Sequence, residues 1–469
     1  MKQEAWGQTE SQLRFSEVSK HKIYSYNMNL PNYKKCEEFA GVLFIIFSGL
    51  VITALYKISN YMTFPNLDEL LWQTRSRVFW DKITTFDFSG LIQSAQPGIM
   101  VYWFTGFMMK FVDFDFSYMN YLVEKEEAAG GNFNDVMNTN DQAVYAIYER
   151  VSFLFNFPLI MLMVVFFILF YYLIRKIGFN RVIASFSLFF LVSNIFFIYW
   201  TTPSDKMLNI FMTLSTLTFL VYMRNRASKK YLVYSAIFGS WAVLSKISAL
   251  FIIPFFFMVY AYYLCPIDRK KIIIVFKDAA VWAIVFCLVS IIFLPTIVTN
   301  PVEIYNLIFT TSGNVYETTY GAKSFVFKLP DYLGPMFMIL GSSMSPGIII
   351  YLVVFAYLAS KKKYRSLFDY GPRKEVNIIG AYIILFMIEV AVLSINHDIR
   401  FMSPAFVMLN IIAGVAFYNV MEIIRKKLNF GLIYYYQMAM IVIILSQILT
   451  IFSTGLMMQE FIKKIFNRS

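Results

Sequence analysis

An acidic pair, Asp68 and Glu69, stands at the start of a predicted helix, just after the first long apolar segment of the chain. Asn66 can cap that helix, with Glu69 at its third position as in a capping box, and the helix dipole favours both acids there. Because successive helix residues point about 100° apart, one acid can cap the helix while the other faces a membrane cavity. A helix start also keeps Asp68 ionised, which a general base requires. The alternative is that both acids only stabilise the helix.

Cations are predicted at the outer ends of three apolar segments, at Lys206, Lys246 and Arg400. Lys246 interrupts an otherwise apolar stretch, where a buried cation costs about 2.5–3.5 kcal/mol on insertion scales and therefore needs a partner. Together the three cations could hold an anionic phosphate, and Arg400 is suited to two-pronged contact. For Lys206 and Arg400 the structural alternative is a side chain that extends to the membrane interface.

Polar and aromatic residues on the same predicted side could line a substrate cavity. These are Gln96, Trp72, Trp103, Asp205 and His397. The two tryptophans are equally typical of the aromatic belts at membrane interfaces. His397 stands alone at an external corner, where a histidine is more often solvated than catalytic.

Motifs for other chemistries are missing from the sequence. Nothing resembles a phosphate-binding Gly loop, a nucleophile elbow or a metal cluster, and the 3 cysteines and 2 histidines are scattered. Asp68, Glu69 and Asp205 could supply oxygen ligands to a divalent cation, but no metal or other cofactor is required. If the chain is an enzyme, the energy for its reaction must therefore come from an activated substrate. A polyprenyl-phosphate sugar is such a substrate and fits a membrane-embedded site.

The composition excludes a soluble globular protein. Of 469 residues, 58% are hydrophobic and 15% charged, and the mean hydropathy is +0.59, whereas soluble proteins have about 25% charged residues. The apolar runs are continuous rather than alternating, which favours spanning helices over a β-barrel. The net charge of +12 comes from basic clusters in short loops, as in the cytoplasmic loops of membrane proteins, and does not indicate nucleic-acid binding. We predict an all-α polytopic membrane protein.

About eleven spanning helices are predicted from the apolar stretches and the basic loops, with the N-terminus inside and the C-terminus outside. They cover residues 39–58, 151–174, 182–200, 207–223, 231–245, 247–264, 279–298, 336–359, 376–395, 401–420 and 432–457.

Two places need a decision of their own. The apolar core Ile99–Met109 is too short to span a bilayer, so residues 97–116 are predicted as a helix on the external surface. Residues 231–264 are too long for one span and have basic clusters on both sides. They are predicted to form a helical hairpin that turns at Ser245 and Lys246.

These assignments divide the chain into segments and place it in the plasma membrane as a multi-pass protein, with its site on the extracytoplasmic face. The segments are a cytoplasmic tail (1–38), a first transmembrane helix and retained signal anchor (39–58), an external loop with juxtamembrane helices and the candidate acid (59–150), the second to seventh spans (151–298), a second external loop (299–335), the eighth to eleventh spans (336–457) and a C-terminal tail (458–469).

The order of several short motifs resembles the GT-C glycosyltransferases of the protein O-mannosyltransferase and aminoarabinose transferase family. The motifs are Leu67-Asp68-Glu69, Arg75, Phe79-Trp80, Asp87-Phe88, Gln96-Pro97-Gly98 running on to Trp103, Arg150-Val151, Pro203-Ser204-Asp205, Leu244-Ser245-Lys246 and Arg400-Phe401-Met402-Ser403-Pro404.

This resemblance implies a GT-C fold, Asp68 as general base on an acceptor hydroxyl, a polyprenyl-phosphate sugar donor and inversion at the anomeric carbon. Gln96 stands where many relatives have His, and the sequence lacks the large lumenal insert of the eukaryotic mannosyltransferases. A bacterial-type sugar transferase is therefore favoured over protein O-mannosylation.

Three classes of function remain open. In a transferase, Asp68 would activate the acceptor, while Arg400, Lys246 and Lys206 would stabilise the departing lipid phosphate. A transporter or flippase would explain charges inside the membrane, but it predicts broken helices in matching halves of the chain. A polysaccharide polymerase or ligase would also use lipid-linked substrates. The expected partners are the lipid-linked donor, membrane lipid and an acceptor that the sequence does not name.

Overall fold

The computed structural model describes residues 38–49, 51, 67–88, 90–91, 98–110, 142–194, 202–266, 268–306, 353, 356–357, 372–393 and 402–428. Side chains are described for these residues except 67–71, 142–150, 389–393 and 426–428. The chain divides into two units, Met1–Phe44 and Ile45–Ser469. In the first unit, residues 38–44 are helical. The elements below belong to the second unit.

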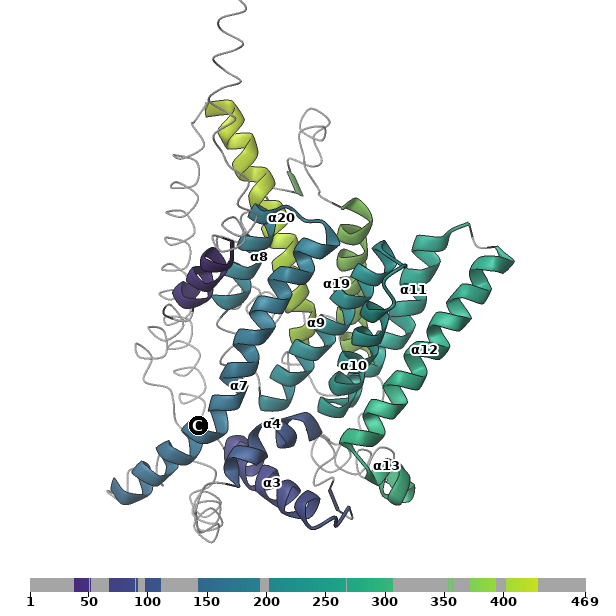
Figure 1. The fold of residues 1–469 in the computed structure, drawn as a ribbon. Helices are drawn as coiled ribbons and strands as arrows, with labels where there is room; N and C mark the ends of the chain where they lie inside the picture. Colours follow the sequence, from purple (N-terminus) through teal and green to yellow (C-terminus); the bar gives the residue numbers. More distant parts are fainter. Residues whose placement is uncertain are drawn as a thin grey trace, which may run out of the picture. The chain divides into compact units, whose positions relative to one another are not determined.

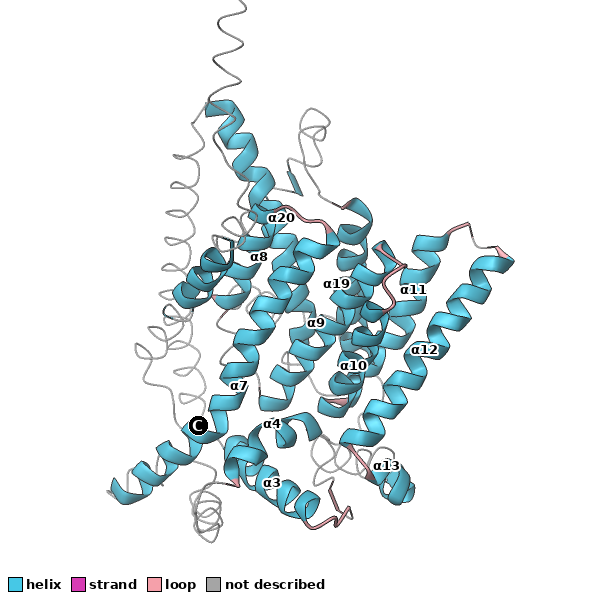
Figure 2. Ribbon diagram, viewed as in Figure 1, coloured by secondary structure: helices cyan, strands magenta, loops and turns pink. Residues whose placement is uncertain are grey.

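Helices make up the described part of the chain, and no strand occurs in it (Figure 2). Five of these helices are long and apolar enough to cross a membrane, which is consistent with an all-α membrane protein. They are Val151–Ile177, Pro203–Arg224, Ile247–Leu264, Arg269–Phe293 and Ser403–Arg425. The predicted spans at residues 336–359 and 432–457 lie almost entirely outside the described residues.

The helices that matter for the site follow one another along the chain (Figure 1). They are α3 (Leu67–Thr84), α4 (Ile99–Met109), α7 (Gln142–Ile177), α8 (Arg181–Val192), α9 (Pro203–Arg224), α10 (Lys230–Ser245), the short 3-10 turn η2 (Ile247–Phe251), α11 (Ile252–Leu264), α12 (Arg269–Phe293), α13 (Thr296–Thr299), α14 (Pro301–Tyr305), α19 (Arg373–Leu393) and α20 (Ser403–Leu428).

Polar caps explain where several of these helices begin. The side chains of Asn180, Thr202 and Asp268 each accept a hydrogen bond from the backbone N–H three residues later, which satisfies an otherwise unpaired donor. The predicted turn at Ser245 and Lys246 is confirmed, since α10 ends at Ser245 and Lys246 has extended backbone angles (φ −160°, ψ 134°).

Basic residues gather at one end of the helices, called here the basic end. Arg224 of α9 donates a hydrogen bond to the Ile177 carbonyl at the end of α7. Lys229, just before α10, pairs with Asp278 of α12. Lys271 of α12 donates to the Leu264 carbonyl of α11 (3.0 Å). These contacts join helix ends that the charge pattern assigns to the cytoplasmic side.

Helix α9 occupies the centre of the described bundle, where it packs against α7, α10, α11, α20 and α4. In its most apolar window 94% of the residues are buried, compared with 6% for α12. Ser215 of α9 donates to the Ser235 carbonyl of α10 (2.7 Å), and Phe219 stacks on Phe256 of α11 with ring centroids 3.9 Å apart. α12, by contrast, presents much of its apolar surface outward.

At the opposite end, called the α4 end, α4 lies across the ends of the longer helices (Figure 1). Its bounds, Ile99–Met109, are those of the predicted apolar core. It packs against α3 on one side and against α7, α9 and α10 on the other. Ile99 to Tyr102 are therefore buried, and α4 is a layer between α3 and the bundle rather than a helix lying free on the surface.

Candidate functional site

The acidic pair lies where the sequence places it. Asp68 and Glu69 occupy the first turn of α3, but their side chains lie outside the described residues, as do Gln96, His397 and Arg400.

Trp72, one helical turn after Asp68, fixes α3 against the start of α4. Its ring lies so close to Gly98 that a Cβ built there would be 2.1 Å from Cζ3 of Trp72. Gly98 also has a left-handed backbone (φ 55°), which glycine adopts at the least cost. The ring centroids of Trp72 and Tyr102 are 5.5 Å apart. Trp72, predicted to line a cavity, is thus buried by α4 itself in this structure.

Farther along, α3 and α4 interlock through small residues. Ser76 and Thr105 share a hydrogen bond of 2.9 Å between their hydroxyls. Trp80 lies over Gly106, where an added Cβ would be 2.0 Å from Cδ1 of the indole. The indole N–H of Trp80 donates to the Tyr102 carbonyl (2.8 Å). The two helices therefore form one closely packed layer.

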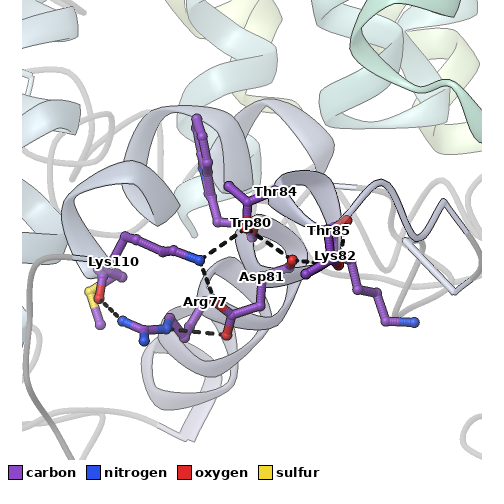
Figure 3. Close-up of polar contacts among 8 residues, drawn as sticks. Arg77, Trp80, Asp81, Lys82, Thr84, Thr85 and Lys110 are labelled. Carbon is purple, nitrogen blue, oxygen red and sulfur yellow. Dashed lines mark hydrogen bonds and ion pairs between the residues drawn. The ribbon is translucent and has the colours of Figure 1, made fainter.

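Asp81 closes this layer at its far end (Figure 3). Its carboxylate lies 3.2 Å from Nε of Arg77 and 2.9 Å from Nζ of Lys110, and Arg77 also donates to the Met109 carbonyl (2.7 Å). Burial acts to raise the pKa of Asp81, but the hydrogen bond from Lys110 and the charges of Arg77 and Lys110 outweigh it, so the pKa is lowered.

The start of α4 is also tied to the end of α10. The backbone N–H of Gly98 donates to the Ser245 carbonyl (3.3 Å). The next residue, Lys246, places Nζ 2.6 Å from Oδ1 of Asp205, and the two side chains are 8% and 3% exposed. The partner that the burial of Lys246 requires is thus Asp205, at the N-terminus of α9.

Asp205 is held by more than Lys246. Its Oδ2 accepts a hydrogen bond from the Thr202 hydroxyl (2.8 Å), and its own backbone N–H donates to that hydroxyl oxygen (3.3 Å). The N-terminal end of the α9 dipole favours the carboxylate further. Lys206, also predicted to bind phosphate, follows Asp205 on α9 and is partly exposed.

Trp103 fastens α4 to α12. Its indole N–H donates to the Phe293 carbonyl at the end of α12 (2.8 Å). Beyond α12, the Thr296 hydroxyl donates to the Phe88 carbonyl (2.9 Å), and Glu303 accepts from the Gly90 N–H (3.3 Å). The segment that begins with the acidic pair is therefore anchored to α9, α10 and α12.

Sequence reasoning missed a second buried acid, Asp278 of α12. It is buried at the basic end, where Lys229, Arg226 and the hydroxyls of Tyr222 and Tyr260 all contact it. The predicted span starts at residue 279 and so leaves out Asp278 by one position. In the structure, α12 begins at Arg269 and includes Asp278. The signal was present, because Asp278 is an acid inside an apolar run, and such residues demand partners.

A metal centre is not formed by the part of the chain that the structure describes, since no group of three or more His, Cys, Asp or Glu side chains there could hold a metal ion.

Comparison with protein-family models, with characterised proteins and with solved structures gives no match. The class that the described residues define is a helical protein with apolar helices of membrane-spanning length and a buried ion pair beneath a two-helix layer.

Proposed function

We propose that the chain is an integral-membrane glycosyltransferase of the GT-C type, with about eleven spans, that transfers a sugar from a polyprenyl phosphate to an extracytoplasmic acceptor. Asp68 takes the proton of the acceptor hydroxyl as its oxygen attacks the anomeric carbon. The bond from that carbon to the lipid-phosphate oxygen breaks at the same time, so the configuration inverts. The lipid phosphate leaves with the bonding electrons.

The observation that carries the proposal is the hydrogen bond from Gly98 to the Ser245 carbonyl, next to the Lys246–Asp205 pair. Segments far apart in the sequence meet there, and each belongs to the set of motifs that resembles the family. Trp72, which packs on Gly98, follows Asp68 by one helical turn, and residues four apart share a helix face.

The motif that contains Ser403 also contacts the first part of α9, at the α4 end of the bundle. Ser403 at the start of α20 is hydrogen-bonded to Asn209 (2.9 Å), one turn after Asp205 on α9. Arg400 precedes Ser403 by three residues in the sequence. Because Ser403 lies beside α9, the proposal takes Arg400 as a cation of the same site.

Charge balance assigns different roles to the cations. Lys246 and Asp205 neutralise each other, so the pair alone offers no net charge to a phosphate. Lys206 and Arg400 supply the positive charge that stabilises the leaving phosphate, and Asp205 holds Lys246 in position. The α4 end faces outward because the basic end follows the positive-inside rule. This orientation in the plasma membrane sets the acid on the extracytoplasmic face.

The test is release of undecaprenyl phosphate by the purified protein in nanodiscs, from a panel of undecaprenyl-phosphate-linked sugars supplied together with a panel of hydroxyl acceptors (lipid, glycan and peptide). Asp68→Asn is expected to lower kcat by about 100-fold or more, as for loss of a general base. The matched control is Asp87→Asn, an exposed acid just beyond α3 whose contact with Lys82 is long (3.7 Å). Undiminished turnover by Asp68→Asn would remove the mechanism.

A transporter or flippase is the second candidate, since a buried ion pair near a membrane surface also occurs in transport pathways. Flux of the lipid-linked sugar across sealed proteoliposomes, with no covalent product and no released undecaprenyl phosphate, would favour this class.

A further inference from the structure

An apolar cavity of about 180 Å³ lies between α9, α10, α11 and α12, away from the α4 end. Its walls include Phe219, Leu232, Phe256, Tyr260 and Trp282, and Asp278 lies among them. An apolar cavity of about 150 Å³ is known to take up benzene. The cavity therefore has room for a segment of hydrocarbon chain, although not for a large ligand.

The cavity opens between α11 and α12. Its wall on α11 runs from Ile253 to Tyr260, a length of about 10 Å along the helix axis. Ile253 and Phe257 in that wall are 39% and 52% exposed, and Ala283 on α12 is exposed too. The opening therefore lies on the same side as the outward apolar faces of α11 and α12. In a bilayer, lipid chains surround these faces.

Asp278 is the one charged residue among the described residues that line the cavity, and basic residues next to the lining surround its carboxylate. Asp278 accepts hydrogen bonds from the Tyr260 hydroxyl (3.3 Å) and from Nη2 of Arg226 (3.2 Å), and it pairs with Lys229. Two cations around one carboxylate leave one positive charge in excess. The Lys229 side chain is 58% exposed. Nε of Arg226 is buried and has no hydrogen-bond partner within the described part of the chain.

We propose that this cavity binds an anionic membrane phospholipid, with an acyl chain between α11 and α12 and its phosphate at Lys229 and Arg226. Basic pockets between helices at the cytoplasmic surface recognise anionic head groups in this way, and the phosphate oxygens supply further acceptors for the exposed Lys229 side chain and for the Arg226 guanidinium.

This site is separate from the proposed donor site. Tyr222, at the basic end of α9, contacts Asp278, whereas Asp205 lies at the start of the same helix. The helix length between Asp205 and Tyr222 is about 26 Å, close to the thickness of the hydrocarbon core. Lipid binding in this cavity therefore does not depend on the chain being a glycosyltransferase.

The experiment measures lipid binding by native mass spectrometry of the purified full chain, titrated with dioleoyl-phosphatidylglycerol or dioleoyl-phosphatidylcholine. The wild type is expected to bind phosphatidylglycerol more tightly. Lys229→Gln should weaken phosphatidylglycerol binding about fivefold, the effect of one lysine near a membrane surface, and leave phosphatidylcholine binding unchanged. Ala283→Phe should block the cavity and weaken the binding of both lipids.

Matched controls come from the same end of the bundle. Lys176→Gln removes an exposed cation at the end of α7, and Ala261→Phe adds a ring to an exposed position of α11 that does not line the cavity. Both should bind as the wild type does.

A second readout locates the acyl chain. Phosphatidylglycerol with brominated chains should quench the fluorescence of Trp282, and Trp282→Phe should remove that part of the quenching. Ala279→Val is the milder variant if Ala283→Phe does not fold. Equal affinity of the wild type for the two lipids, or unchanged binding in both Lys229→Gln and a cavity variant, overturns the proposal.

Discussion

Lys246 lies 2.6 Å from Asp205 and joins the last residue of α10 to the first turn of α9. The adjacent Ser245 carbonyl accepts the N–H of Gly98, so the ion pair stands directly behind the backbone that positions α4. Because α4 packs on α3, the placement of the Asp68 segment depends on a pair of charges next to this backbone contact.

The first prediction concerns that pair. Asp205→Asn leaves a buried ammonium without its counter-charge and should destabilise the protein by about 3–5 kcal/mol. Lys246→Met should also destabilise the protein, because the buried Asp205 carboxylate loses its counter-charge and keeps neutral partners such as the Thr202 hydroxyl. The double variant should recover most of the loss, since neither charge then remains. Thermal unfolding of the four proteins in one detergent gives the coupling energy, and additive losses would contradict a direct pair.

The second prediction concerns Gly98. Gly98→Ala adds a Cβ that meets the Trp72 ring at a backbone conformation unfavourable to alanine. We expect a loss of about 1–3 kcal/mol and weaker protection of the α3 and α4 amides from hydrogen exchange. Gly380→Ala in α19 is the control, because nothing lies within 4 Å of its added Cβ. There the change should be neutral or stabilising by up to about 1 kcal/mol.

The third prediction concerns Trp103. Trp103→Phe keeps an aromatic ring but removes the hydrogen bond to the Phe293 carbonyl, at a cost of about 1 kcal/mol. Hydrogen exchange of the α4 amides should quicken about fivefold without a change at the basic end. Trp282→Phe removes a longer hydrogen bond (3.3 Å) far from α4 and should leave α4 unaffected. Equal protection of α4 in both variants would exclude Trp103 as an anchor.

The fourth prediction concerns pH. The pKa of Asp81 is lowered in the folded protein, so the ionised carboxylate contributes to the free energy of unfolding. This contribution is fully present above the unfolded pKa of about 3.9 and is lost as the pH falls through the lower folded pKa. Asp81 is 48% exposed, which limits the effect to less than about 1 kcal/mol. In Asp81→Asn, the free energy of unfolding of the α3–α4 layer should therefore fall less between pH 6 and pH 2 than it does in the wild type.

This pH profile can be followed by hydrogen exchange or by tryptophan fluorescence. Asp87→Asn is the control, because its contact with Lys82 is longer and equally exposed. A steeper profile in Asp81→Asn than in the wild type would show that the sign is wrong.

Several features of the fold could be predicted from local sequence. The bounds of α4 follow from the apolar run Ile99–Met109 between Gly98 and Lys110. The break at Lys246 follows from a cation in a run too long for one span. The bounds of α9 and α10 lie within a few residues of the predicted spans, since caps and basic ends are local signals.

By itself, the sequence determined that the protein is helical and that its apolar helices can cross a membrane, because hydrophobic length and continuity are properties of single segments. It also placed Asp68 at a helix start and required a partner for Lys246. Only the tertiary structure decided which partner that is, since Asp205 lies 41 positions away in the sequence. It also decided that Trp72 packs on Gly98 and that Asp278 is buried among basic residues. The physical reason is that a buried charge is stable only when an opposite charge lies beside it. Which helix supplies that charge depends on how the helices pack, and no local sequence pattern specifies the packing.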